Sequence, residues 1–481
     1  MNPEFWILTP DSFFEQLRRL RGGSTVYLEN WLHDIIRKTL DYSPRQSLAR
    51  PDVEQYQNFK LRRALHYACE RSAFYREQFQ KAGLGPDGIQ NREDLSRLPL
   101  TDPLQIAENP YRFLCLSRAE IARIHTFVTS GTTGPQKKIF WTQGDLDRIT
   151  GFMAAGIGTV AYREDVVQIL LPDGRPHSQA DLLYQGVRKL GAVPVLASLS
   201  LSAREQFGLI EQWRSTVLFG YAGRVFRISK ELQDTHDLRN AGIKVLFLAA
   251  EYLPDPRRRE MEAMWNCRVH THYGLTEMGL GVAVECDARN GYHFNEADLL
   301  LEIVDPQTGN PVTAGQEGEL VFTTLNREAM PLIRYRTHDI SRLITEPCAC
   351  GAHSLLKFDS VKKRLELIVK LEGGDEVYPV FFDDRLSEIP GFIDYQLIVT
   401  RHEGKDRLDF RIETMPGCTD RIPEIRQTLL STPLIANNMA AGRMAEPLIE
   451  MVGWGALQTA DRAKKLIVDR REELAPICGR G

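Results

Sequence analysis

Residues 129–138 combine the side chains and the backbone freedom that a bound phosphate requires. They read Thr-Ser-Gly-Thr-Thr-Gly-Pro-Gln-Lys-Lys, with two glycines, four hydroxyl residues and two lysines. Glycine adopts backbone conformations that other residues avoid, so the main chain can wrap closely around an anion. Successive backbone N–H groups in such a loop form a concave anion site, and hydroxyls and lysines add donors and positive charge. The sequence therefore predicts a phosphate-gripping loop.

This loop is not the Gly-x-x-x-x-Gly-Lys-Ser/Thr P-loop, because its glycine spacing differs and no Lys-Ser/Thr follows the second glycine. A solvated Ser/Thr/Gly turn is the alternative that these residues leave open. The flanks favour the phosphate loop. Residues 124–128 are β-branched and aromatic, as in a strand, and residues 145–157 have helical apolar spacing. Loops that follow a strand are where α/β proteins hold phosphates.

Four blocks of the chain, in their order and separation, resemble the motifs of the adenylate-forming enzymes (acyl-CoA synthetases, adenylation domains and luciferases). The blocks are residues 129–134, 273–277 (Tyr-Gly-Leu-Thr-Glu), 318–320 (Gly-Glu-Leu) and 335–339 (Tyr-Arg-Thr-His-Asp). Residues 74–77, 98–102 and 322–325 look like the phenylacetate-CoA ligase branch in particular. The resemblance covers roughly residues 50–475.

The resemblance implies a reaction in two halves. A carboxylate attacks the α-phosphorus of ATP, which gives an acyl-adenylate and pyrophosphate. A thiol, usually that of coenzyme A, then displaces AMP. Phosphoryl and acyl transfers of this kind need charge neutralisation more than covalent participation by the protein.

The resemblance also implies roles for single residues. Thr276 touches the α-phosphate, and Glu277 holds Mg²⁺, a hard cation that prefers oxygen ligands. Asp339 accepts hydrogen bonds from both ribose hydroxyls, which one carboxylate can do at once. Tyr273 stacks on the adenine. The nucleotide-binding set is Thr129, Ser130, Gly131, Thr132, Thr133 and Gly134 on the phosphates, Lys137 beside them, Ala250 and Glu251 along the adenine and acyl pockets, and Tyr273, Gly274, Asp339 and Arg364.

Plainer interpretations stay open for several of these residues. Glu277 could be an acid at a helix N-terminus, interacting with the helix dipole. Asp339 could form an Asx turn or a cap. Lys137 and Lys138 could simply be solvated.

A second constellation consists of Cys286, His293, Cys348 and Cys350. Three thiolates and one imidazole would complete a tetrahedral structural zinc site. Cys-x-Cys is tighter than the usual ligand spacing, but some phenylacetate-CoA ligase relatives look to have ligands at matching places. His353 is a substitute candidate for the histidine. The alternative is four thiol and imidazole groups that bind no metal.

The C-terminal part departs from the family pattern at the lysine that bridges carboxylate and α-phosphate during adenylation. Without gaps, Ala463 occupies its position, and a one-residue shift offers Arg462 or Lys464. Arginine is charged but forked, so it does not replace a lysine point charge. The family's Gly-Arg-Ser-Asp-Asp hinge block is Lys-Arg-Leu-Glu-Leu at 363–367, where only Arg364 survives.

Three functions are consistent with this mixture. In the first, Lys464 or Arg462 compensates, and the protein is an ATP-dependent acyl- or aryl-CoA ligase for a carboxylic acid, favoured as aromatic by the branch. In the second, adenylation is lost and the protein exchanges an acyl group between coenzyme A and a carrier-protein thiol. In the third, it is a non-catalytic homologue that binds a nucleotide or acyl ligand. Fold alone does not decide between them.

The bulk composition excludes other classes. A formal net charge of -4 gives no electrostatic basis for nucleic-acid binding. No apolar run approaches the ~18 residues of a membrane span. The first residues, Met-Asn-Pro-Glu-Phe-Trp, lack the features of a signal peptide, so a cytoplasmic location is expected. Eight cysteines without a secretion signal argue against a disulfide framework.

The expected partners are a small carboxylic acid and coenzyme A or an acyl carrier protein, with a homodimer as a candidate assembly.

The hydrophobic patterns predict an α/β fold. The resemblance implies two domains, a large one over residues 1–362 with parallel sheets flanked by helices and a small mobile α+β domain over 363–481. Residues 1–120 look helical and polar, with helical spacing at 61–79 and 106–114 and with Pro103 and Pro110 as breakers. The apolar runs at 166–171 and 244–248 predict buried parallel strands flanked by helices. The runs at 299–304 and 319–324 alternate, which is closer to antiparallel strands.

Overall fold

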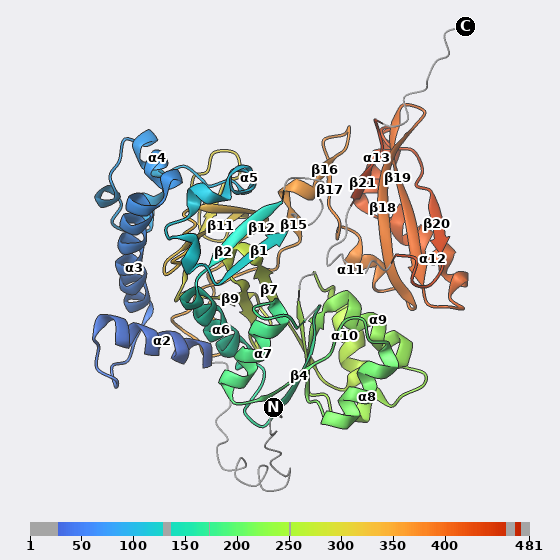
Figure 1. The fold of residues 1–481 in the computed structure, drawn as a ribbon. Helices are drawn as coiled ribbons and strands as arrows, with labels where there is room; N and C mark the ends of the chain where they lie inside the picture. Colours follow the sequence, from blue (N-terminus) through green and yellow to red (C-terminus); the bar gives the residue numbers. More distant parts are fainter. Residues whose placement is uncertain (1–26, 128–135, 173, 250–251, 458–466, 473–481) are drawn as a thin grey trace.

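The computed structural model describes residues 27–127, 136–172, 174–249, 252–457 and 467–472 (Figure 1). Within these residues the chain forms a large domain, built on two sheets, and a small C-terminal domain with a sheet of its own. No helix in these ranges is long and apolar enough to cross a lipid bilayer.

The main sheet of the large domain has nine strands, in the order β13-β14-β9-β8-β7-β6-β5-β3-β4. The strands from β4 to β7 run parallel, whereas β8, β9, β14 and β13 continue the sheet antiparallel. The predicted parallel runs are thus confirmed, in a sheet that is mixed as a whole. The strands are β3 (Val166–Leu170), β4 (Val193–Leu196), β5 (Val217–Tyr221), β6 (Val245–Ala249), β7 (Arg268–Leu275), β8 (Leu280–Glu285), β9 (Tyr292–Phe294), β13 (Leu343–Ile344) and β14 (Lys357–Phe358).

Helices cover both faces of this sheet, because neighbouring strand residues point to opposite sides. Phe219 and Phe247 belong to the core under α6 (Gln143–Ile157) and α7 (Gln179–Leu190). Leu218 and Leu246 belong to the core on the other face, under α8 (Ala203–Trp213), α9 (Ala222–Leu232) and α10 (Asp255–Trp265). Apolar residues on both faces explain why the parallel strands are continuously hydrophobic.

A second, antiparallel sheet has the order β10-β11-β12-β15 and carries the third and fourth motif blocks. Its strands are β10 (Leu299–Val304), β11 (Gly318–Thr324), β12 (Tyr335–Ser341) and β15 (Lys363–Arg364). The antiparallel prediction is confirmed, although β10 and β11 are buried along their whole length. A separate hairpin, β1 (Arg123–Phe127) and β2 (Lys137–Trp141), flanks the predicted phosphate loop.

The N-terminal helices are α2 (Tyr27–Leu40), α3 (Arg50–Arg71), α4 (Ala73–Lys81) and α5 (Pro103–Glu108). One predicted helical stretch is interrupted where no break was expected, and the other breaks at Pro110, as predicted. The 61–79 stretch breaks at Ser72, whose extended backbone lets its hydroxyl accept from Tyr75 N as the cap of α4. The 106–114 stretch breaks at Asn109, because the residue before a proline avoids the helical region, and a short 3₁₀ turn (Pro110–Phe113) follows.

The small domain packs two helices against a four-stranded sheet of order β20-β19-β18-β21. Its elements are β16 (Val369–Lys370), β17 (Glu376–Val377), α11 (Asp383–Leu386), β18 (Phe392–His402), β19 (Lys405–Thr414), α12 (Ile422–Leu430), α13 (Pro433–Ala440), β20 (Ile449–Val452) and β21 (Ile467–Asp469). Since β15 still pairs with β12 and the small domain's core begins at Leu371, the change of domain lies between them. The exact boundary stays a prediction.

The small domain docks on the α8–α10 side of the large one (Figure 1). Ile393 of β18 belongs to the core beneath these helices, and its carbonyl accepts from Arg257 at 2.7 Å. Arg227 of α9 makes a two-point ion pair with Glu413 of β19, at 2.5 and 2.9 Å. Both side chains are buried, so the two domains share a fixed polar contact inside an apolar interface.

Candidate active site

The second motif block lies where β7 ends and turns through a short 3₁₀ helix, η6 (Thr276–Met278), into β8. The strands approach closely here: a Cβ on Gly274 would lie 2.5 Å from the carbonyl oxygen of Leu280. Only glycine fits this position. Gly279 closes the turn with φ +105°, a conformation that other residues rarely adopt. The motif's glycine therefore allows the sharp turn that presents Thr276 and Glu277.

Glu277 is buried and held by two neighbouring side chains. Lys137 Nζ donates to its Oε1, and the Tyr335 hydroxyl donates to the same oxygen at 2.6 Å. Lys137 opens β2, at one end of the predicted phosphate loop, and its ammonium lies 5.4 Å from the ring centre of Phe127 at the other end. The structure thus brings the second and fourth motif blocks together at one carboxylate, with Lys137, which follows the first block in the chain.

Asp339 and Arg364 are partners across strands β12 and β15. The guanidinium donates to both carboxylate oxygens, at 2.6 and 2.9 Å, and the Tyr273 hydroxyl donates to Oδ2 at 2.5 Å. Burial raises the pKa of Tyr273 well above its usual value and the nearby Asp339 raises it further, so the phenol remains a donor. Asp339 is therefore a buried, fixed carboxylate rather than a local Asx turn.

Several predicted site residues lie outside the described part of the chain. They are Thr129, Ser130, Gly131, Thr132, Thr133, Gly134, Ala250, Glu251 and Lys464. Of the described residues next to the predicted loop, Phe127 and Lys137 lie near each other, and Lys137 pairs with Glu277.

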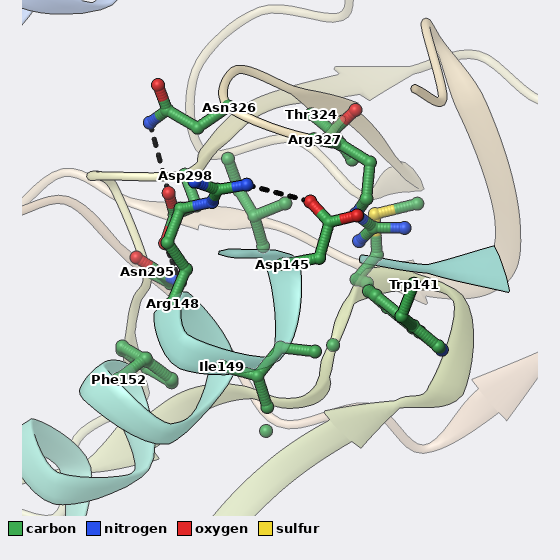
Figure 2. Close-up of a pocket in the computed structure, with 14 residues that line it drawn as sticks. Trp141, Asp145, Arg148, Ile149, Phe152, Asn295, Asp298, Thr324, Asn326 and Arg327 are labelled. Atoms are coloured by element: carbon green, nitrogen blue, oxygen red, sulfur yellow. Dashed lines mark hydrogen bonds and ion pairs between the residues drawn. The ribbon is translucent and has the colours of Figure 1, made fainter. Parts of the chain in front are cut away.

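A polar cavity adjoins η6 between the start of α6, the β9–β10 connection and the β11–β12 connection (Figure 2). Arg327 stacks on Trp141 at 4.0 Å and donates to the carbonyl of Glu277 at 3.0 Å. Burial lowers the pKa of Arg327 to about 10, which leaves it charged at neutral pH. Asp145 ties α6 to the neighbouring connection through Arg148 and the N–H groups of residues 328 and 329. Asp145 thus fixes the connection that carries Arg327, and Arg327 in turn holds the carbonyl of Glu277.

An apolar pocket lies on the α6 and α7 side of the main sheet. Its wall includes three rings from adjacent strands: Phe219 of β5, Phe247 of β6 and His272 of β7. Phe219 meets Phe247 edge-on at 5.6 Å between ring centres and stacks on His272 at 5.0 Å. Burial lowers the pKa of His272 to about 4, so its imidazole is neutral at neutral pH. The pocket is therefore uncharged along this wall.

The four predicted metal ligands converge. The candidate ligand atoms of Cys286, His293, Cys348 and Cys350 all lie within 4.8 Å of one another. Sγ of Cys286 is 3.5 Å from Sγ of Cys348, and Sγ of Cys350 is 3.5 Å from Nε2 of His293. His353 is exposed and does not join this group among the described residues, so it is not the substitute ligand considered from the sequence.

Sequence reasoning assigned no role to the residues that complete these sites, although Tyr335 stands in the fourth motif block. Tyr335 and Arg327 support Glu277, and the pocket rings come from three separate strands. Phe219 and Phe247 look like ordinary core residues in the sequence. His272 carried a signal, since a histidine within a buried strand, beside the motif's Tyr273, breaks the apolar pattern.

Comparisons with known proteins agree with this geometry. A profile of the AMP-binding enzyme family matches residues 124–326, and a profile of the AMP-binding enzyme C-terminal domain matches residues 374–471. The phenylacetate-coenzyme A ligase of Thermus thermophilus is 30% identical over 82% of this chain and 88% of that protein. The phenylacetate-coenzyme A ligase of Escherichia coli is 28% identical over 77% and 84%.

Among solved structures, a 2-hydroxyisobutyryl-CoA ligase in its postadenylation state superposes with a TM-score of 0.76 at 18% identity, covering 90% of this chain and 94% of that one. The same ligase in its thioesterification state gives 0.62. The chain belongs to the AMP-binding enzyme family, and within it to the branch similar to phenylacetate-CoA ligases. It is therefore an adenylate-forming enzyme, of the kind that joins a carboxylic acid to a thiol through an acyl-AMP.

Proposed function

We propose that this protein activates an aromatic carboxylic acid with ATP and transfers the acyl group to coenzyme A. The supporting observation is that two neighbouring residues of β7 face two different sites. Neighbouring residues of a strand point to opposite faces. Tyr273 bonds to Asp339 on the nucleotide side, and His272 stacks with Phe219 in the apolar pocket. The acid and the nucleotide would thus meet at the end of one strand.

The pocket favours an aromatic acid because ring edges and faces form its wall. Aromatic rings prefer offset-stacked or edge-to-face contacts, and each such pair contributes about 0.5–1.5 kcal/mol beyond area burial. The relatives named phenylacetate-CoA ligase support the same class of acid. A carboxylate could not lie against His272 for charge neutralisation, because that imidazole is neutral. The acid would therefore enter ring first, with its carboxylate toward Thr276.

On the nucleotide side, Glu277 and Asp339 would exchange some of their present hydrogen bonds for contacts with Mg²⁺ and with the nucleotide when ATP binds. Glu277 would hold Mg²⁺, which neutralises phosphate charge, and this frees Lys137 to pair with a phosphate oxygen. Asp339 would accept from the ribose hydroxyls, and Arg364 would keep its carboxylate oriented. Thr276 would donate to the α-phosphate. These assignments rest on the convergence of the motif blocks at Glu277.

Pyrophosphate release tests the proposal. Purified protein is incubated with ATP, Mg²⁺ and a panel of phenylacetic, benzoic and aliphatic acids, and thioester is then measured with coenzyme A or a phosphopantetheinylated carrier protein. We expect acid-dependent pyrophosphate with aromatic acids and thioester with coenzyme A. If no acid releases pyrophosphate, yet acyl groups pass from acyl-CoA to the carrier without ATP, the acyl-exchange alternative replaces this proposal. If neither pyrophosphate release nor acyl exchange occurs, the non-catalytic alternative replaces the proposal.

We also propose that Cys286, His293, Cys348 and Cys350 hold a structural zinc ion. With Zn–S bonds near 2.3 Å, the sulfurs of a tetrahedral site lie about 3.8 Å apart, close to the 3.5 Å between Cys286 and Cys348. His293 Nδ1 lies 3.2 Å from the carbonyl of Leu356, which leaves Nε2 as the metal-facing atom. These ligands would join the β8–β9 hairpin to the β13–β14 connection.

Metal analysis of the purified protein tests the zinc site. We expect one equivalent of zinc and a lower melting temperature after chelation. Cys348→Ser should lose the metal, whereas Cys267→Ser, outside the cluster, should keep it. Metal-free protein with unchanged melting in chelator would contradict the site.

A further inference from the structure

The apolar pocket contains a polar atom that the proposed reaction does not use. Nε2 of His272 is buried, and within the described part of the chain it has no hydrogen-bond partner. An unpaired buried polar group is costly, and native structures rarely retain one without a reason. Because His272 lines the pocket that would receive the acid, the missing partner is expected on the ligand.

The protonation of the ring decides what that partner must be. Burial lowers the pKa of His272, while a backbone hydrogen bond with Tyr273 opposes this shift. Of the two ring nitrogens of His272, only Nε2 is buried without a partner among the described residues. Since Nε2 is the unpaired nitrogen, the proton is assigned to Nδ1. Nε2 therefore carries a lone pair and acts as an acceptor.

The surroundings favour an uncharged donor on an aromatic ring. Phe219 and Phe247 pack around the imidazole, and Gln179 is the other side chain with a polar end on the wall. A charged ammonium would lose its hydration there without gaining a counter-ion, so it would bind poorly. A phenolic hydroxyl or an aromatic amine supplies one N–H or O–H at no such cost.

We infer that His272 is a specificity-determining residue that selects an aromatic acid bearing a hydroxyl or amino substituent, through a hydrogen bond from that substituent to Nε2. This inference rests on the proposed function, because it takes the apolar pocket as the site of the acid. It narrows the substrate class from aromatic acids to hydroxy- or amino-substituted ones. A site that accepts a hydrogen bond discriminates strongly against an analogue without the donor, because the buried acceptor is then left unpaired.

The kinetic test compares kcat/KM for phenylacetic and benzoic acids with that for their ortho, meta and para hydroxy and amino derivatives. We expect at least one substituted acid to be preferred about tenfold or more over its parent by the wild type. His272→Leu should reduce that preference about tenfold, mainly by raising KM for the substituted acid, and His272→Gln, which keeps an acceptor, should restore part of it.

His270→Leu is the matched control. His270 lies two residues earlier on β7 and is more deeply buried than His272. Its Nδ1 is also unpaired among the described residues, but it lies outside the pocket, with Nε2 3.7 Å from Asp287. Its replacement should leave the ratio between substituted and parent acids unchanged. An equal ratio in wild type and His272→Leu, or a wild-type preference for every unsubstituted parent, would overturn the inference.

A binding measurement separates this inference from the proposed function. Phenol and toluene have nearly the same shape and need no ATP. By calorimetry, phenol should bind wild type at least several-fold more tightly than toluene, and His272→Leu should remove the difference. If no acid releases pyrophosphate but phenol is still selected, the proposed function fails, and only the selection of a hydroxyl donor by His272 stands. If toluene binds wild type as well as phenol does, the inference fails whatever the enzyme assay shows.

Discussion

At the scale of single residues, the site contains two buried carboxylates, and each is paired with other side chains of the protein. Glu277 is paired with Lys137 and Tyr335, and Asp339 with Arg364 and Tyr273. A buried charge is tolerated only with such partners. The pairs therefore fix the oxygens at the positions where a metal ion and a ribose would be held.

Asp339→Asn tests the ribose assignment. The amide keeps the shape of the side chain but loses the charge that strengthens its hydrogen bonds, so ATP or AMP should bind about 1.5–3 kcal/mol more weakly. Calorimetry measures this change. Asp359→Asn is the control, since Asp359 is a partly exposed carboxylate paired with Arg342 at 3.0 Å. Unchanged nucleotide affinity in Asp339→Asn would remove Asp339 from the nucleotide site.

At the scale of elements, the short segment η7 (Leu365–Leu367) between the domains is tied to the large domain by one imidazole. Nδ1 of His338 lies 2.7 Å from Glu366, and Nε2 lies 3.6 Å from Asp102 at the start of α5. Burial lowers the pKa of His338, but the carboxylates of Asp102, Glu366 and Glu319 outweigh it and raise the pKa to about 9. The ring is thus charged at neutral pH.

This pairing predicts a loss of stability at alkaline pH. Because the folded pKa lies above the unfolded value of about 6.5, the contribution is complete below pH 6.5 and disappears as the pH rises through about 9. After allowance for solvent screening it is on the order of 1–2 kcal/mol. The melting temperature should fall more between pH 7 and 9.5 in wild type than in His338→Gln. His66→Gln, an exposed histidine paired with Asp87, should melt like wild type. Parallel pH curves for wild type and His338→Gln would contradict the assignment.

The C-terminal segment that carries Arg462, Lys464 and Lys465 is the element expected to supply the adenylation cation. Lys464→Ala should abolish pyrophosphate release, because no point charge would bridge carboxylate and α-phosphate. Conversion of pre-made acyl-adenylate with coenzyme A should persist. Robust adenylation after removal of all three cations would place the catalytic cation elsewhere in the chain. If Ala463 instead holds the lysine position, wild-type adenylation should be slow and Ala463→Lys should raise it.

At the scale of the whole molecule, the Arg227–Glu413 pair holds the small domain in the docked arrangement. Glu413 also accepts from the backbone N–H groups of Gly455 and Leu457, so one carboxylate joins α9 to the end of the small domain's chain. Removal of one partner of a buried pair typically costs about 3–5 kcal/mol. Glu413→Gln should therefore loosen the domain interface more than it disturbs either domain alone.

Solution scattering and thermal melting measure this effect. Glu413→Gln should show a larger radius of gyration and a lower melting temperature than wild type. Glu450→Gln should show neither change, because Glu450 is an exposed residue of β20 that pairs only loosely, at 3.3 Å, with Arg411. A Glu413→Gln variant with wild-type scattering and melting would mean that apolar contacts around Ile393 hold the domains without this pair.

The sequence by itself determined the family and the α/β fold, and it named Lys137, Glu277, Tyr273, Asp339 and Arg364, which the described part of the structure brings into two paired groups. This was possible because short motifs carry the local chemistry: Glu277 and Asp339 stand in motif blocks, and Gly274 of the same motif as Glu277 is required by a close backbone approach. The helix end at Ser72 escaped prediction, because apolar periodicity continues across a cap, whereas Pro110 marked the break at Asn109.

Only the tertiary structure decided which side chains contact each other across different strands. The pairing of Asp339 with Arg364 depends on the register of two strands, and the ring wall of Phe219, Phe247 and His272 depends on the side-by-side order of β5, β6 and β7. Such contacts join residues far apart in the chain, so no local pattern encodes them. The same holds for the unpaired nitrogen of His272. The sequence shows that residue 272 is a histidine, but only the surrounding side chains show that its Nε2 has no partner among the described residues.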